Sequence, residues 1–226
     1  MEIKIHDLYK TLLSHFGKQG WWPAEDKFEV IVGAILTQNT AWKNVEKAID
    51  RLKKEKVLSL EGILNIEKEV LKELIKSSGF YNQKADRLKS FVEYIDRNYK
   101  GDLNLFLYRD TNKVRKELLS INGIGLETAD SILLYAGDHA IFVVDAYTRR
   151  LCKRLPLLKG MGCDDYESVR KKFEKELKKK IRDEKELIKM YKEFHALIVK
   201  LAKTYCKKKP VCKKCPLMKK CSFGGV

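Results

Sequence analysis

The stretch LLSINGIGLETADSILLYA, residues 118–136, does most to decide the fold class of this chain. Apolar residues close one helical pattern, Gly123 and Gly125 flank Ile124 in a short turn, and a second helical pattern begins at once. Glycine lacks a Cβ, so the backbone amides of such a turn can approach a ligand closely. The first amides of the second helix can also bind an anion. The pattern therefore predicts either a hairpin that binds phosphates of nucleic acid or an ordinary αα-hairpin.

On both sides of this hairpin, apolar residues recur at helical spacing. Segments such as VEKAIDRLKKEK, KADRLKSFVEYIDRNY and YESVRKKFEKELKKKI place them three and four positions apart. The segment FEVIVGAILTQ, residues 28–38, has enough β-branched residues to form a strand, but no second strand is evident that could pair with it. The sequence therefore predicts an all-α protein.

The composition indicates a polyanionic partner. Lysine and arginine total 47 against 31 acidic residues, a formal charge of +16 in 226 residues. Nucleic acid is the leading partner and an anionic membrane the second, while a thermophile-like charged surface is the alternative explanation. No apolar run reaches the roughly 18 residues that span a bilayer, and the N-terminus MEIKIHDLYK does not resemble a signal peptide. We expect a cytoplasmic protein without membrane association, whose cysteines are not paired as disulfides.

Four of the six cysteines stand together near the C-terminus. Their spacing is C-x5-C-x2-C-x5-C, and the segment CKKKPVCKKCPLMKKC around them carries seven lysines. Four neighbouring thiolates favour a structural zinc ion or an iron–sulfur cluster. One C-x2-C knuckle, where zinc ribbons present two, favours the cluster. The cysteines of this predicted metal site are Cys206, Cys212, Cys215 and Cys221.

A single aspartate follows the longest apolar run after the hairpin. In IFVVDAYTRR, Asp145 stands where a helix begins. The side chain could serve as a helix N-cap. It could also be an ionised carboxylate that stabilises a developing cation or activates a water molecule. Its position alone does not separate these two interpretations.

Taken together, the hairpin, VVD, the four-cysteine loop, ILTQNT and SGFYNQKA resemble helix-hairpin-helix DNA glycosylases of the endonuclease III type, over roughly residues 28–221. The resemblance implies a two-lobed all-α fold with a DNA groove between the lobes. It assigns residues 29–136 to a six-helix lobe with the hairpin, and residues 1–28 and 137–226 to the second lobe. It further implies a [4Fe-4S] cluster in preference to zinc, and Asp145 as the catalytic carboxylate that acts once a damaged nucleotide is flipped from double-stranded DNA.

The chain departs from endonuclease III at two points. That enzyme carries a nucleophilic lysine two residues after its second hairpin glycine, and Glu127 occupies this position here. Without an amine no Schiff base forms, so the resemblance implies a monofunctional glycosylase that uses water. The first cysteine spacing, x5, is also one residue shorter than the x6 usual in the family.

The segment WWP and the aromatic residue in QNTAW are similar to the methylpurine branch of this superfamily, which removes 3-methyladenine or 7-methylguanine. Indole faces stack on a flipped base and attract a cationic, alkylated purine. The alternative is that the tryptophans are core residues. The residues that this resemblance assigns to the base pocket, including the polar neighbours or wedge, are Trp21, Trp22, Pro23, Gln38, Asn39, Trp42 and Glu127.

The sequence thus predicts a monomeric, monofunctional DNA glycosylase that acts on alkylated purines. One alternative is an endonuclease III-like enzyme for oxidised pyrimidines or T:G mismatches, with or without lyase activity. The other is a DNA-binding or redox-sensing iron–sulfur protein without catalytic activity.

Overall fold

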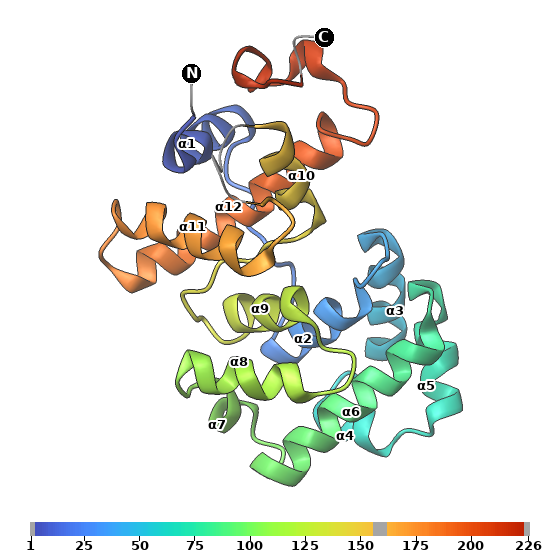
Figure 1. Cartoon of the computed structure of the whole chain (residues 1–226). Helices are drawn as coiled ribbons and strands as arrows, with labels where there is room; N and C mark the ends of the chain where they lie inside the picture. Colours follow the sequence, from blue (N-terminus) through green and yellow to red (C-terminus); the bar gives the residue numbers. More distant parts are fainter. Residues whose placement is uncertain (1–2, 156–161, 224–226) are drawn as a thin grey trace. The chain divides into compact units, whose positions relative to one another are not determined.

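The computed structural model describes residues 3–155 and 162–223. Within these residues the chain is helical and contains no β-strand, which confirms the predicted all-α class (Figure 1). The chain divides into two compact units. One is Ala24–His139, and the other combines Met1–Pro23 with Ala140–Val226. In the described part of the chain, no helix is both long and apolar enough to cross a membrane.

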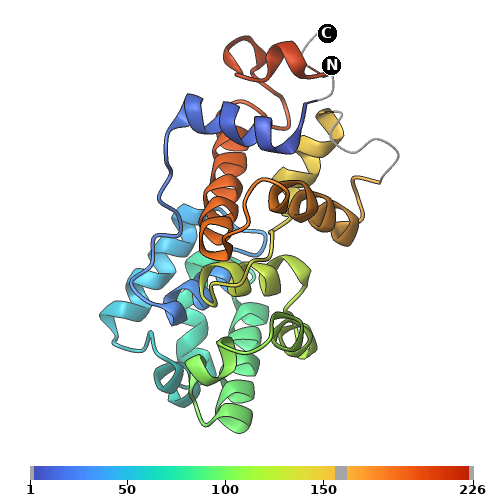
Figure 2. The ribbon, with the colours of Figure 1, turned by 90° about the vertical axis from the view of Figure 1, so that its left-hand side faces the viewer.

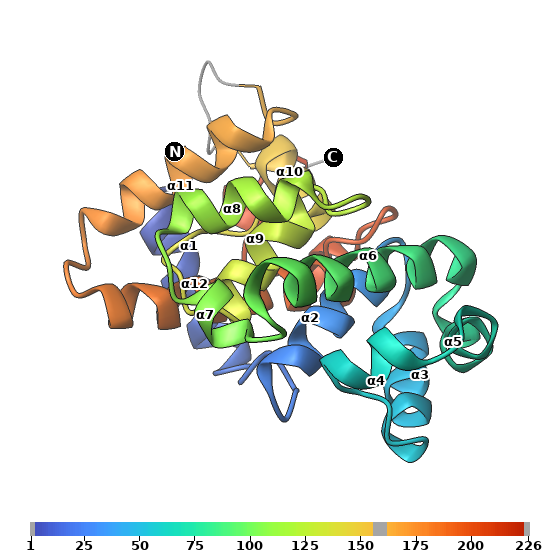
Figure 3. The ribbon, with the colours of Figure 1, turned by 90° about the horizontal axis from the view of Figure 1, so that it is seen from below.

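The unit Ala24–His139 is built around the hairpin. Figure 3 shows α8 beside α9, and α9 in turn packs on α2. Its elements are α2 (Lys27–Leu36), α3 (Trp42–Lys54), α4 (Leu60–Asn65), α5 (Lys68–Ile75), the 3-10 helix η1 (Lys76–Ser78), α6 (Tyr81–Tyr99), α7 (Leu103–Leu107), α8 (Thr111–Ser120) and α9 (Leu126–Tyr135).

The other unit joins the N-terminal helix to the C-terminal third of the chain. Its helix α1 packs against α12, as Figure 2 shows, and α12 also packs against α10. Its elements are α1 (Ile5–Phe16), α10 (Ala146–Arg154), α11 (Tyr166–Lys178), α12 (Glu184–Thr204) and the 3-10 helices η2 (Cys212–Lys214) and η3 (Met218–Lys220).

Helix α2 explains why the β-branched segment is not a strand. Every residue from Phe28 to Leu36 is buried, so the helix is apolar on all sides, as expected for a helix at the centre of a unit. The Asp26 side chain accepts a hydrogen bond from the Glu29 amide and begins the helix. Burial on all sides outweighs the modest strand preference of valine and isoleucine.

Aspartates begin many of the helices. An N-cap oxygen satisfies one of the first backbone amides, which have no partner within the helix. The aspartates that do so are Asp26, Asp102, Asp110, Asp145, Asp165 and Asp183.

Aromatic side chains fill the core of the unit that carries Asp145. Phe142 stacks on Phe173 with ring centroids 4.8 Å apart and meets Tyr191 and Phe194 edge to face. Such pairs add about 0.5–1.5 kcal/mol each beyond the apolar area that they bury. Phe142 lies three residues before Asp145, so this core holds the start of α10 in place.

A fully buried lysine organises the end of α2. Lys84, on α6, has no exposed surface, and its ammonium group donates 2.7 Å hydrogen bonds to the Leu36 carbonyl, the Thr40 hydroxyl and the Ser78 carbonyl. Burial, with a smaller contribution from the charge of Arg87, lowers the pKa of Lys84 to about 8. Three acceptors compensate the buried cation and tie the turn after α2 to η1.

We expect Lys84→Met to lower the free energy of unfolding by about 3 kcal/mol, because it leaves three acceptors buried, each worth about 1 kcal/mol. Chemical denaturation measures the change. Lys47→Met, at an exposed position on α3, is the control and should change stability by less than about 0.5 kcal/mol. Equal effects of the two substitutions would contradict the role assigned to Lys84.

Candidate functional site

The hairpin forms where the sequence predicts it, between α8 and α9. Ile124 is buried, and its amide donates to the Ile121 carbonyl at 3.1 Å, which closes the turn. The two helices are joined by Arg115, whose guanidinium donates to both oxygens of the fully buried Asp130 at 2.6 and 3.1 Å. A bidentate pair of this kind fixes orientation as well as distance. The backbone amides of the turn are therefore held on a rigid support.

The two hairpin glycines differ in how strongly the fold requires them. Gly123 has φ of 80°, and an added Cβ would lie 2.3 Å from Cγ of Arg87, so both conformation and packing demand glycine. Gly125 has φ of −91° and serves as the N-cap of α9, and a Cβ there would meet no atom within 4 Å. The fold itself does not demand glycine at Gly125. A ligand that approaches the Gly125 backbone closely would require glycine there, because a Cβ would block it.

Gln38 lies against the hairpin. Its side-chain amide donates to the Gly123 carbonyl at 3.0 Å and to the Thr128 hydroxyl at 2.8 Å, while Arg87 donates a short hydrogen bond to its side-chain carbonyl. Sequence reasoning missed Arg87, because its partners are distant along the chain. These bonds connect the turn after α2 to the hairpin.

Next to Gln38, two adjoining turns present exposed side chains. Asn39 is exposed in the left-handed conformation, with φ of 54°. Phe80 is 63% exposed, also with positive φ, and had not been predicted. Thr40 donates a short hydrogen bond to the Ser78 carbonyl, which joins the two turns. A bulky residue with positive φ and an exposed ring is uncommon and marks a candidate functional position.

Asp145 is a helix N-cap, which is one of the two interpretations drawn from the sequence. It is the N-cap of α10, and its Oδ1 accepts from the Thr148 amide at 2.7 Å and the Thr148 hydroxyl at 2.8 Å. Its Oδ2 lies 3.5 Å from Nε2 of His195, on α12. Burial acts to raise the pKa of this carboxyl, but the bonds from His195 and Thr148 outweigh it and the pKa is lowered. Asp145 is therefore a buried carboxylate held in its ionised form.

The adjacent tryptophans stack on one another and on the same histidine. Trp21 and Trp22 lie in a segment that is not helical, with ring centroids 5.3 Å apart and planes 15° apart. Trp21 also stacks on His195 at 5.6 Å and 30°. Both tryptophans are partly exposed. His195 went unnoticed in the sequence because a single histidine in an apolar helix resembles an ordinary core position.

The remaining predicted pocket residues do not all belong to the unit of the tryptophans. Pro23 follows Trp22 directly. Trp42 is the first residue of α3, and Glu127 lies in the first turn of α9, so both belong to the unit Ala24–His139, as do Gln38 and Asn39.

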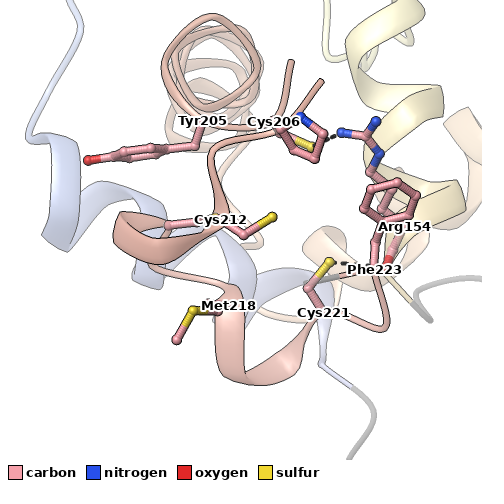
Figure 4. Close-up of a pocket in the computed structure, with 9 residues that line it drawn as sticks. Arg154, Tyr205, Cys206, Cys212, Met218, Cys221 and Phe223 are labelled. Carbon is pink, nitrogen blue, oxygen red and sulfur yellow. Dashed lines mark hydrogen bonds between the residues drawn. The ribbon is translucent and has the colours of Figure 1, made fainter. Parts of the chain in front are cut away.

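The four C-terminal cysteines line one cavity. Figure 4 shows the sulfurs of Cys206, Cys212 and Cys221 facing a common space, which Cys215 also lines. Arg154 donates to the Cys206 sulfur at 3.1 Å. Burial raises the pKa of the Cys215 thiol, and the three neighbouring cysteines add to this effect. Among the described residues, no three cysteine, histidine or acidic side chains are arranged to hold a single metal ion.

A glycine-containing hairpin on one unit, together with a buried carboxylate beside stacked aromatic rings on the other, defines a helix-hairpin-helix DNA repair protein. Residues 32–179 match the model of the HhH-GPD superfamily base excision DNA repair protein. The chain belongs to this superfamily of base excision repair proteins, and its class is that of the DNA glycosylases.

Individual relatives agree with this assignment. The chain is 50% identical to the "Putative DNA repair glycosylase MJ1434" of Methanocaldococcus jannaschii, over 91% of this chain and 90% of that protein. Endonuclease III of Thermotoga maritima is 28% identical, over 75% of this chain and 74% of the relative. Among solved structures, H. pylori 3-methyladenine DNA glycosylase bound to 1,N6-ethenoadenine superimposes with a TM-score of 0.78 at 32% identity, covering 89% of this chain and 98% of that one.

We expect the two hairpin glycines to respond differently to alanine. Gly123→Ala should lower the free energy of unfolding by about 1–2 kcal/mol, from the left-handed conformation and the contact with Arg87. Gly125→Ala should cost less than about 1 kcal/mol, the usual loss at an N-cap, yet weaken binding to duplex DNA by about tenfold. Thermal unfolding and fluorescence anisotropy separate the two effects. Full DNA affinity in Gly125→Ala would contradict a close backbone contact with phosphate.

Proposed function

We propose that this protein is a monofunctional DNA glycosylase that removes alkylated purines, such as 3-methyladenine and 7-methylguanine, from double-stranded DNA. The single observation that carries the proposal is a series of contacts: Trp22 stacks on Trp21, Trp21 stacks on His195, and His195 faces the ionised Asp145. A surface for a cationic base and a carboxylate for the sugar thus belong to one compact unit.

The chemistry requires little from the protein beyond these groups. An alkylated purine already carries a positive charge, so when the C1′–N bond breaks, its electron pair stays on the base, which leaves as a neutral molecule. The Asp145 carboxylate stabilises the cationic sugar that remains. A water oxygen then bonds to C1′, and Asp145 accepts the proton that the water releases and passes it to solvent. The products are a free base, an abasic site and one proton.

The tryptophan pair supports an alkylated purine as the substrate. Base stacking on an aromatic side chain contributes about 1–3 kcal/mol, and a cationic base gains further from the electron-rich indole face. An oxidised pyrimidine is uncharged and smaller, so it would gain less from the same surface. The H. pylori structure named for 3-methyladenine supports the same substrate class.

The opening left by the flipped nucleotide has to be filled. Asn39 and Phe80 are exposed on adjoining turns, and Lys84 and Thr40 hold those turns together. We assign these two side chains to the vacated stack, because a short amide and an aromatic ring can replace the hydrogen bonds and the stacking of the lost base.

The donor set of the C-terminal loop fits a [4Fe-4S] cluster. Four cysteines line one cavity, and the Arg154 guanidinium, which contacts Cys206, supplies positive charge beside the thiolates. Bound there, a cluster would cross-link a loop that otherwise contains only two short 3-10 helices. The lysines of this loop would then face the phosphate backbone.

Base release distinguishes the proposed substrate from its alternatives. On duplexes that carry 7-methylguanine, thymine glycol or a T:G mismatch, we expect release from the first, with strand breaks only after alkali. Asp145→Asn should slow release about 100-fold or more and leave DNA affinity unchanged. Asp165→Asn is the matched control, because asparagine replaces another N-cap aspartate of the same unit. Release from thymine glycol alone would contradict the proposal.

Borohydride trapping tests the monofunctional assignment. We expect no covalent complex with the native enzyme, because Glu127 supplies no amine, and trapping in Glu127→Lys. A trapped complex in the native enzyme would identify a second nucleophile and contradict hydrolysis by water alone.

Metal analysis tests the cysteine loop. Protein purified without oxygen should contain about four iron and four sulfide per chain and absorb visible light. Cys215→Ser should lose iron and unfold at lower temperature, whereas Cys163→Ser, which removes a cysteine outside the cavity, should do neither. One zinc per chain without sulfide would contradict the cluster.

A further inference from the structure

His195 is a buried titratable residue to which the proposed chemistry assigns no step. It lies on α12 with 4% of its surface exposed. Most of its neighbours in the helix, from Phe194 to Val199, are buried and apolar. An imidazole here must bring polar atoms into an apolar core, which costs free energy unless they find partners. The side chain reaches across to α10 and meets Asp145.

The two oxygens of Asp145 have different surroundings. Oδ1 accepts both hydrogen bonds from Thr148 and serves the helix cap. Oδ2 faces Nε2 of His195 at 3.5 Å, which is long for a hydrogen bond and within range for an ion pair. Catalytic hydrogen bonds are often long in the absence of substrate and shorten in the complex. Oδ2 is therefore the oxygen that is not used by the helix cap, and His195 lies beside it.

We propose that His195 is a positioning residue for Asp145: it orients Oδ2 toward the sugar and keeps the carboxylate ionised, and Trp21 holds the imidazole ring in place. This inference rests on the proposed function, because it acts on the carboxylate that cleaves the glycosidic bond. Nε2 is the ring atom that faces the carboxylate, at 3.5 Å from Oδ2. The proton that the water releases goes to Asp145 and then to solvent, so the role proposed for His195 is to orient the carboxylate.

The stack on Trp21 distinguishes this arrangement from an ordinary buried histidine. The same indole contacts Trp22 and His195, so the surface proposed to bind the base also fixes the ring that orients the carboxylate. A base stacked on the tryptophan pair would contact the same indole that holds the His195 ring. Base binding and carboxylate alignment are thereby linked through Trp21.

The ionisable groups that face Asp145 are His195 from α12 and the Cys152 thiol from α10 itself. Burial raises the pKa of Cys152 to about 12, so this thiol is neutral at working pH. His195 is thus the group that lowers the pKa of Asp145 from across the interface between these helices. Removing its donor should raise that pKa, and activity should then be lost at a higher pH on the acid side of the profile.

Two substitutions of His195 distinguish the contribution of its aromatic ring from that of its hydrogen-bond donor. His195→Phe keeps an aromatic ring for Trp21 but has no donor, and we expect base release in single turnovers to fall about 10- to 100-fold. The acid limb of its pH profile should move to higher pH. His195→Gln restores a donor near the position of Nε2 and should recover part of the rate and of the pH shift. An unchanged rate and acid limb in His195→Phe would overturn the proposal.

A double-mutant cycle tests whether His195 acts through Asp145. In the Asp145→Asn background, His195→Phe should cause no further loss, because the group that it orients is already disabled. Equal losses in both backgrounds would show independent action and overturn the proposal. Tyr191→Phe is the matched control. It removes a buried hydroxyl from the same helix, for which the described residues provide no hydrogen-bond partner, and should leave the rate and pH profile unchanged.

The failure of this inference can be distinguished from failure of the proposed function. The cycle is run on whichever of the three damaged duplexes the native enzyme processes, so a wrong substrate assignment leaves the test of His195 intact. Full activity of Asp145→Asn would overturn the catalytic assignment and the role of His195 with it. Full activity of His195→Phe, with Asp145→Asn inactive, would overturn the positioning role alone. Anisotropy on an abasic-site duplex and thermal unfolding establish that each variant still folds and binds DNA.

Discussion

Compensation of buried charge is the constraint on which both units depend. Removing an ion from water costs several kcal/mol unless hydrogen bonds and opposite charge replace the lost hydration. In one unit the ion is the carboxylate of Asp145, compensated by Thr148 and His195. In the other it is the ammonium group of Lys84, compensated by two carbonyls and the Thr40 hydroxyl. Each arrangement holds chain segments that are distant in sequence, and each adjoins residues proposed to act on DNA.

The compensated ion Lys84 explains how the turn after α2 keeps a fixed conformation although it lies outside a helix. The turn after α2 has a few local backbone hydrogen bonds, such as those from the Gln38 amide to the Ile35 carbonyl and from the Thr40 amide to the Thr37 carbonyl. Lys84 fixes the turn through hydrogen bonds to the Leu36 carbonyl and the Thr40 hydroxyl. Arg87 and the Gly123 carbonyl fix the Gln38 side chain. The hairpin proposed to bind phosphate and the turn proposed to fill the vacated base position are thus connected within one unit. Rigid support of this kind reduces the entropy lost when DNA binds.

The proposed substrate class depends on the tryptophan pair. The hairpin and a buried aspartate suit any member of this superfamily. An aromatic surface beside the carboxylate favours a base that is already cationic, because such a base leaves without protonation. The cysteine loop carries seven lysines and takes no part in the proposed choice of base.

The sequence by itself determined the helical class, the hairpin, the helix N-cap at Asp145 and the grouping of four cysteines. Each of these depends on residues that are close along the chain, where spacing and local chemistry suffice to predict them. Only the tertiary structure decided that Gln38 binds the hairpin, that Gly125 is not required for packing, and that His195 lies between Trp21 and Asp145. These contacts join segments that are far apart in sequence, and a buried polar group finds its partner only when the helices pack.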